Sequence, residues 1–277
     1  MNDASMVVTS QSGRVLTLTL NRPDDLNPLS WQVLNKLWAA LEVARDDNGV
    51  GVVVIAAAGK AFSTGYDLRE EHWITSQYPA NFEDRVDLRQ DRDDVHTIVD
   101  YWMKLWRYPK PLIAKVQGDC LSGAGELLGV CDLAIASDAA RFGHPAGRDL
   151  GIPPSIMFWP MLIGYRKTKE LLYTSRLIDA REAANIGLIN QVVTPDALDS
   201  TVAEIAAHIA RAPSDNLSVL KEVSNTWFEH MGMEPSIRRG ADLDAIYHQF
   251  DSFKDFFQTL RKDGVKAAFK RRRDLYG

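Results

Sequence analysis

The chain has few cysteines, no long apolar run and no excess of basic residues, and each absence excludes a class of protein. Two cysteines in 277 residues, Cys120 and Cys131, cannot form a disulfide framework, and no Cys-x-x-Cys or paired histidine spacing indicates a metal site. The longest apolar runs, such as 52–58, are far shorter than the roughly 20 residues that span a bilayer. The N-terminus has an acid early and lacks the apolar stretch of a secretory signal. We therefore expect a cytoplasmic protein with no membrane partner.

The charge balance is mildly acidic, with 37 Asp and Glu against 32 Lys and Arg and a net charge of −5. A dedicated nucleic-acid binder needs clustered Lys and Arg for phosphate contacts, so we expect no nucleic-acid partner. Apolar residues make up 45% and charged residues 25%, which is average for globular proteins and excludes a disordered or collagen-like chain. Composition alone does not name a reaction.

Strand and helix patterns alternate through the first two thirds of the chain. Period-two alternation predicts a strand over 15–20, and apolar spacing predicts a helix that begins near Ser30. Further buried strands are predicted at 52–55, 111–116 and 133–136, with helices at 95–106 and 202–209; the charged stretch 67–94 indicates a surface excursion. This order favours an α/β core. Because strand patterns stop near residue 197, we predict a core domain at 1–196 and a helical region at 197–277.

Two glycine-rich stretches follow predicted strands. They are FSTGYDL at 62–68 and GDCLSGAGELL at 118–128, and the second runs into a predicted helix. Glycine lets a turn point backbone N–H groups at a ligand, and the unpaired N–H groups of a helix start attract negative charge, including a transient oxyanion. The alternative is that each stretch is only a tight turn between packed elements.

Other readings of the second stretch fail on spacing. A dinucleotide site needs G-x-G-x-x-G, but Gly123 and Gly125 are followed by Gly129, one residue too late. Ser122 lacks the flanking glycines of a nucleophile elbow.

An ordered set of segments resembles the crotonase, or enoyl-CoA hydratase/isomerase, superfamily. The segments are NRPDDLNPLS (21–30), FSTGYDL (62–68), PLIAKVQGDCLSGAGELLGVCDLAIASDAARFGHP (111–145), LGIPP (150–154), LIDAREAANIGLINQVV (177–193) and DGVKAAFKRRR (263–273). The match is poor at 69–109 and 225–250. The resemblance implies an α/β fold, the ClpP/crotonase-like spiral of ββα units, with a helical C-terminal trimerisation region. It also implies homo-trimers, commonly paired into hexamers.

The resemblance also implies an acyl-CoA thioester substrate whose enolate oxygen is held by two backbone N–H groups. Carried over by position, these belong to Tyr66 and Gly123. Glu126, one helical turn after Gly123, matches one of the two glutamates that hydratases use to hold and deprotonate water. Burial beside an acyl chain raises the pKa of a carboxyl group and suits acid–base chemistry. The alternative is a glutamate that only complements the dipole of its helix.

Coenzyme A enters as part of the substrate, and no separate cofactor or metal is expected. Family-like contacts to CoA are implied at Leu26, Thr64, Leu68 and Arg69. The stretch 261–274 has seven basic and two acidic residues, a local charge of +5 on an acidic chain. It either attracts the 3′-phosphate of CoA or complements the dipole of a helix end.

The second glutamate of hydratases is missing. Its place in the segment 142–151 falls on Ala146 or Gly147, and neither transfers a proton. Asp149 is either a replacement acid or a solvated loop residue, and Arg148 either pairs with a substrate carboxylate or is solvated. Hydration of a 2-enoyl-CoA is the default expectation. The alternatives are isomerisation, decarboxylation or carbon–carbon cleavage with Glu126 alone, and a non-catalytic acyl-CoA-binding protein.

Overall fold

The computed structural model describes residues 5–69, 72, 86–144 and 155–276. Within these residues the larger sheet has the spatial order β1-β2-β3-β4-β6-β9. The strands are β1 (Val7–Ser12), β2 (Val15–Leu20), β3 (Val52–Ala57), β4 (Leu112–Val116), β6 (Leu133–Ser137) and β9 (Gln191–Val193). Strand β1 pairs antiparallel with β2, whereas the later neighbours pair in parallel.

A smaller sheet lies beside the first and contains β5 (Asp119–Leu121), β7 (Arg141–Gly143) and β8 (Ile178–Asp179), in that order. Cys120 of β5 also forms a parallel bridge with Ser63 in the loop after β3. This bridge joins the two glycine-rich stretches that are far apart in the sequence.

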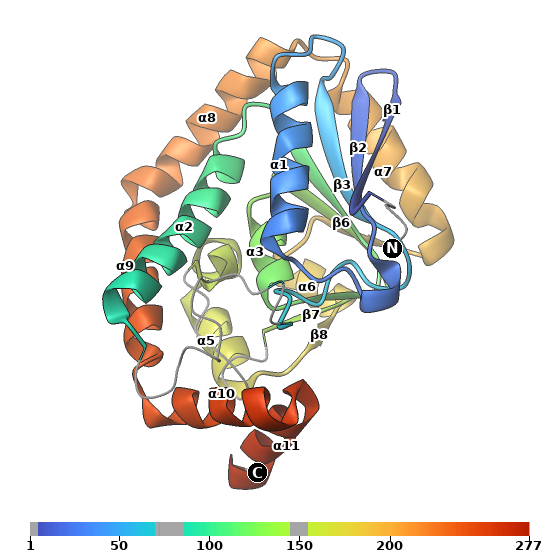
Figure 1. The fold of residues 1–277 in the computed structure, drawn as a ribbon. Helices are drawn as coiled ribbons and strands as arrows, with labels where there is room; N and C mark the ends of the chain where they lie inside the picture. Colours follow the sequence, from blue (N-terminus) through green and yellow to red (C-terminus); the bar gives the residue numbers. More distant parts are fainter. Residues whose placement is uncertain (1–4, 70–71, 73–85, 145–154, 277) are drawn as a thin grey trace.

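Helices cover both faces of the larger sheet (Figure 1). Helices α1 (Trp31–Arg45), α2 (Leu88–Trp106) and α3 (Gly123–Gly129) pack into the main core with one set of strand side chains. Helix α7 (Pro195–Ile209) packs on the opposite face, where its Leu198 and Val202 belong to the same buried apolar cluster as Val52 and Ile113. Strand β3 is buried on both faces, which explains its continuous apolar sequence.

Local sequence explains the helix starts. The Ser30 hydroxyl caps α1 by accepting a hydrogen bond of 3.3 Å from the Val33 N–H, as the predicted start near Ser30 requires. Asp87 caps α2 by accepting from the N–H groups of Arg89 and Gln90. Helix α2 therefore begins seven residues before the predicted 95, and the prediction of a surface excursion through residue 94 was wrong over 88–94.

The remaining helices lie mainly in the C-terminal part of the chain. They are α4 (Trp159–Leu162), α5 (Tyr165–Thr174), α6 (Ala180–Asn185), α8 (Ser214–His230), α9 (Met233–Tyr247), α10 (Asp251–Asp263) and α11 (Val265–Tyr276), with short 3₁₀ turns η1 (Pro23–Asp25) and η5 (Ile156–Phe158). Helix α9 runs beside α2, and α10 packs on α11 (Figure 1). The described part of the chain is helical after β9, as predicted; the boundary at 196/197 itself stays a prediction. None of the helices in the described residues is long and apolar enough to cross a membrane.

Candidate active site

Glu126 is a fully buried carboxyl group in the first turn of α3. Its Oε1 accepts a hydrogen bond of 2.5 Å from the Ser155 hydroxyl, and its Oε2 accepts a short hydrogen bond from the Tyr66 hydroxyl. A buried carboxyl group needs such partners because water does not reach it. Two hydroxyl groups fix its orientation without neutralising its charge.

Tyr66 links this carboxyl group to α2. Its hydroxyl oxygen accepts a hydrogen bond of 2.9 Å from the Trp102 indole nitrogen, Nε1, while its own proton is donated to Glu126. The chain Trp102–Tyr66–Glu126–Ser155 thus draws on four separate segments. Sequence reasoning used only the backbone N–H of Tyr66 and missed the side chains of Tyr66, Trp102 and Ser155, which lie in no local pattern.

Burial is the largest influence on the pKa values of Glu126 and Tyr66. Desolvation raises the pKa of Glu126, and the hydrogen bonds from Ser155 and Tyr66 only partly offset it. Desolvation, together with the neighbouring Glu126 charge, raises the pKa of Tyr66 well above its ordinary value. The phenol therefore keeps its proton, whereas Glu126 is poised to exchange one.

The two glycine-rich stretches meet beside Glu126. The N–H of Leu121 donates to the Ser63 carbonyl at 3.1 Å, and a Cβ on Gly65 would lie 2.6 Å from the Ser122 Cβ. Gly65 has φ +94°, in the left-handed region that favours glycine. Only glycine permits this close approach, which brings the backbone of Tyr66 and that of Gly123 together.

The N–H groups of Tyr66 and Gly123 are the candidate oxyanion donors. Among the hydrogen bonds between described residues, neither N–H acts as a donor. Ser122, which precedes Gly123, has a strained φ of 53° and ψ of −131°. The Tyr66 ring packs against Gly123 so closely that an added Cβ would lie 2.8 Å from it. Two N–H groups with no acceptor among the described residues therefore lie beside a buried carboxyl group.

The four residues expected to contact CoA lie on two paired segments. The Thr64 N–H donates to the Leu26 carbonyl at 3.2 Å, and Leu26 has a left-handed φ of 66°. Leu68 is partly buried and Arg69 is exposed. Arg69 Nη2 pairs with Asp67 at 2.7 Å. The structure thus brings all four together next to the Gly65 loop.

Asp67 anchors this segment. The carboxylate is buried, and its Oδ2 lies 2.9 Å from Arg22 Nη1. Desolvation raises the pKa of Asp67, although Arg22 opposes the shift. Ion pairs of Arg22 with Asp67 and of Arg69 with Asp25 therefore hold the segment 22–26 against the segment 67–69.

The remaining predicted acid, Asp149, lies outside the described residues, as do Ala146, Gly147 and Arg148. His144, just before that segment, is buried, and desolvation lowers its pKa to about 4. It is therefore neutral at physiological pH and supplies no positive charge.

The basic C-terminal end is partly balanced within the chain. Arg271 pairs with Asp255 at 2.6 Å, and Lys270 pairs with Asp274 at 2.6 Å. Both pairs are local to α10 and α11.

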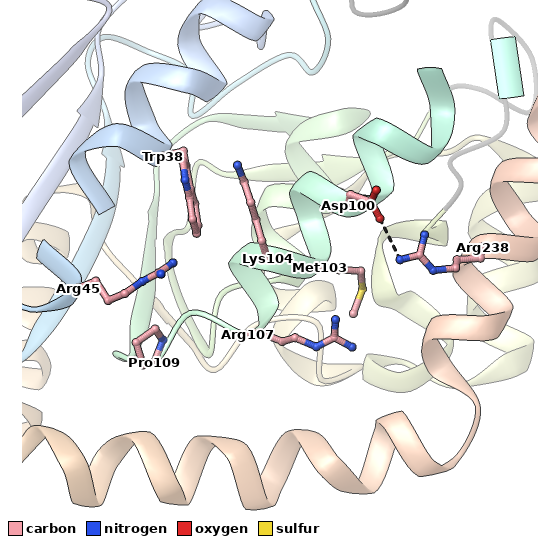
Figure 2. A pocket seen from close by; sticks show the side chains of 8 residues that line it. All are labelled: Trp38, Arg45, Asp100, Met103, Lys104, Arg107, Pro109 and Arg238. Carbon is pink, nitrogen blue, oxygen red and sulfur yellow. Dashed lines mark hydrogen bonds and ion pairs between the residues drawn. The ribbon is translucent and has the colours of Figure 1, made fainter. Parts of the chain in front are cut away.

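A separate pocket of about 500 Å³ lies at the junction of α1, α2 and α9 (Figure 2). Its cations are largely engaged: Arg238 pairs with Asp100, and Lys104 lies over the Trp38 ring at 4.1 Å. None of the residues that contact Glu126 lines it; the lining residues are Trp38, Arg45, Asp100, Met103, Lys104, Arg107, Pro109 and Arg238.

The parallel sheet, the second small sheet and the paired glycine loops define the crotonase fold. Crystal structures bear this out. An enoyl-CoA hydratase from Mycobacterium smegmatis superposes with a TM-score of 0.88 at 26% identity, covering 100% of this chain and 96% of that one. An enoyl-CoA hydratase/isomerase from Xanthobacter autotrophicus gives 0.81 at 32% identity, with 99% of each chain covered.

Sequence comparison is equally extensive. The family model for enoyl-CoA hydratase/isomerase matches residues 10–274. A protein of Rhizobium meliloti named a probable enoyl-CoA hydratase is 34% identical over 279 residues, which is 99% of this chain and 98% of that protein. The chain therefore belongs to the enoyl-CoA hydratase/isomerase family and is an acyl-CoA enzyme.

Proposed function

We propose that this protein hydrates a 2-enoyl-CoA thioester and uses Glu126 to transfer a proton. The observation that carries the proposal is the buried Glu126 carboxyl group, held by two hydroxyl groups beside the N–H groups of Tyr66 and Gly123. The names of the relatives support the same reaction.

The two N–H groups suit the charge that develops in this reaction. When water adds to C3 of the enoyl group, negative charge moves onto the thioester oxygen. Each preorganised donor in such a site typically contributes about 3–4 kcal/mol to the transition state. Glu126, with its raised pKa, is suited to give a proton to C2 of the resulting enolate.

CoA is proposed to lie along the paired segments 22–26 and 64–69. The backbone of Leu26, Thr64 and Leu68 offers polar groups to the adenine, and exposed Arg69 offers a guanidinium to phosphate. The site needs no separate cofactor for this chemistry, because enolate stabilisation and proton transfer use protein groups alone.

Crotonyl-CoA provides the test, because hydration removes the enoyl absorbance. Glu126→Gln is expected to lower kcat by about 10²–10⁴-fold with CoA binding retained. Glu204→Gln, an exposed glutamate on α7, serves as the matched control and should be unchanged. A wild-type protein that binds CoA but leaves crotonyl-CoA intact would refute the proposal.

Isomerisation of a 3-enoyl-CoA is the second candidate. It is favoured by one sequence feature: Ala146 or Gly147 stands where hydratases place a second glutamate. A 1,3-proton shift needs only one carboxyl group, which removes a proton from C2 and returns it at C4. Formation of the conjugated enoyl absorbance from 3-hexenoyl-CoA, without later hydration, would identify this activity.

Self-association is proposed to involve α8. This helix has no buried residue, and it carries an exposed apolar stripe of Leu220, Val223 and Trp227 that continues to Met231, the residue directly after its end. Such residues at one helix face are typical of a protein interface. We expect a trimer or hexamer, and Trp227→Asp should release monomers in sedimentation; a wild-type monomer would contradict this.

A further inference from the structure

The Ser155 hydroxyl group has little freedom to turn away from Glu126. Its oxygen lies 2.5 Å from Glu126 Oε1 and also accepts a hydrogen bond of 3.1 Å from the Met157 N–H. A serine hydroxyl carries one proton, so with the Met157 N–H on its oxygen that proton points at Glu126. The Ser155 backbone N–H hydrogen-bonds to the same carboxyl group. One buried residue therefore presents two donors to Glu126.

The three residues after Ser155 form a left-handed turn. Ile156, Met157 and Phe158 have φ values of 46°, 54° and 60°. A positive φ is uncommon outside glycine and is an outlier for a β-branched residue such as Ile156. Residues in this conformation persist only where the surrounding structure holds them, and they cluster at active sites. The position of the left-handed turn 156–158, directly after a partner of Glu126, fits that pattern.

Helix α3 holds this turn through two glycines. Gly125 and Gly129 are four residues apart and therefore share one face of α3. A Cβ on Gly125 would lie 2.6 Å from the Met157 Sδ. A Cβ on Gly129 would lie 2.7 Å from the Phe158 Cδ2 and equally close to the Met157 carbonyl oxygen. The fully buried Met157 thus fills a groove that exists because α3 lacks side chains there.

Helix α2 also contacts the turn. The Phe158 ring stacks on Trp106, with ring centroids 5.6 Å apart and an interplanar angle of 11°. Trp106 lies four residues after Trp102, whose Nε1 donates to the Tyr66 hydroxyl, so both tryptophans share one face of α2. This face of α2 therefore supports both of the hydroxyl groups that hold Glu126.

A purely local role for Ser155 leaves part of this arrangement unexplained. The hydroxyl caps the short turn η5 by accepting from the Met157 N–H. Capping accounts for the accepted hydrogen bond but not for the donated one. It also gives no reason for three consecutive bulky residues to keep a costly backbone conformation.

We propose that Ser155 is a positioning residue for proton transfer by Glu126, and that the left-handed turn 156–158 holds the Ser155 hydroxyl against Glu126 Oε1. This role rests on the proposed use of Glu126 in proton transfer and deepens it. It applies to hydration and to isomerisation alike, because both reactions need the Glu126 proton aimed at the substrate.

Ser155→Ala tests this role in the full chain with crotonyl-CoA as the probe. We expect kcat to fall about 10–100-fold while KM changes less than about twofold, because the carboxyl group is misaligned but the CoA-binding segments are untouched. The alkaline limb of kcat/KM should move up by about 1–2 pH units, since losing a donor to the ionised carboxylate raises the pKa of Glu126.

Two further serine variants serve as controls. Ser137 is also buried, and its hydroxyl has no hydrogen-bond partner among the described residues, so Ser137→Ala should keep the wild-type rate and pH profile. Ser155→Thr keeps a hydroxyl group at position 155. It should recover most of kcat and return the alkaline limb toward its wild-type position.

A double-mutant cycle with Met157→Ala tests the contribution of the turn. This change empties the groove over Gly125, so it should lower kcat and move the alkaline limb in the same direction as Ser155→Ala. In the Ser155→Ala background it should lower Tm again but change kcat less than about twofold, because residues that act as a unit are not additive. Should Met157→Ala fail to fold, Ser155→Ala and Ser155→Thr decide the proposal by themselves.

A second assay separates this role from the proposed function. Exchange of the C2 hydrogens of butyryl-CoA in deuterated water reports proton transfer by Glu126 without hydration, and both rates should fall in Ser155→Ala. A wild-type enzyme that neither hydrates crotonyl-CoA nor exchanges C2 hydrogens would overturn the proposed function and, with it, the role of Ser155. An active wild type beside a Ser155→Ala variant with kcat within threefold and an unmoved pH profile would overturn the role of Ser155 alone, even if that variant had a lower Tm.

Discussion

Removal of the Tyr66 hydroxyl group should change the pH dependence of the enzyme. The Tyr66 hydroxyl donates to Glu126 and accepts from Trp102 Nε1, whereas the Tyr66 ring packs against Gly123. Tyr66→Phe keeps the ring and removes both hydrogen bonds. The hydrogen bond to Glu126 favours the ionised carboxylate, so its loss raises the pKa of Glu126 further.

The expected size of the pKa shift follows from the negative charge that the Glu126 carboxylate carries as the hydrogen-bond acceptor. A hydrogen bond to a charged group contributes about 1.5–3 kcal/mol, and one pKa unit corresponds to about 1.4 kcal/mol, so the shift should be about 1–2 units. The variant also leaves the buried Trp102 N–H unpaired, which costs about 1–3 kcal/mol of folding stability.

The assay is the pH profile of kcat/KM with crotonyl-CoA. Because Glu126 must be protonated to give its proton to C2, the alkaline limb should move to higher pH in Tyr66→Phe. Tyr101→Phe is the control. Tyr101 is a buried tyrosine on α2, and its hydroxyl donates a hydrogen bond of 2.8 Å to the Leu34 carbonyl rather than to Glu126. It should lose stability without moving either limb. Superimposable profiles for wild type and Tyr66→Phe would refute the coupling.

Two further predictions concern Gly123 and the stability effect of Glu126. Gly123→Ala should lower kcat by about 10²–10³-fold, the usual cost of one lost oxyanion donor, because its Cβ would lie 2.8 Å from the Tyr66 ring; wild-type kinetics would show that the contact does not matter. The raised pKa of Glu126 means that the folded state holds a proton that the unfolded chain has released, so stability falls as pH rises from about 4.3 toward the folded pKa, by up to about 1.4 kcal/mol per pH unit. Thermal unfolding of Glu126→Gln should show a Tm advantage over wild type that grows across this window; a constant difference would contradict the reasoning.

Sequence patterns predicted the strands and helices that are specified by neighbouring residues. The alternation of leucine and threonine in 15–20 predicted β2, and Ser30 marked the start of α1. Strand β1 was not predicted. Only its first residue, Val7, is buried and the other five are exposed, so its sequence lacks a period-two apolar pattern. Helix α2 was predicted too short because its first turns are charged and are specified by the Asp87 cap rather than by burial.

The candidate site likewise has residues that a local sequence pattern predicted and residues that no local pattern revealed. Glycine spacing pointed to the loops at 65 and 123 and to Glu126, since a sharp turn or close approach leaves a mark in the sequence. The partners of Glu126 left none: Ser155 is 29 residues from it, and Tyr66 is 60 residues away.

The choice of hydroxyl partners at Glu126 is itself informative, because the chain has other ways to hold a carboxylate. At Asp255, the Arg271 guanidinium lowers the pKa and keeps the group ionised. At Glu126, two neutral hydroxyl groups orient the carboxyl group, and burial is left to raise its pKa. A guanidinium in the same place would hold Glu126 permanently charged and prevent it from giving a proton. The absence of a cation among its described partners is therefore what proton transfer requires, and a purely structural ion pair would show the opposite arrangement.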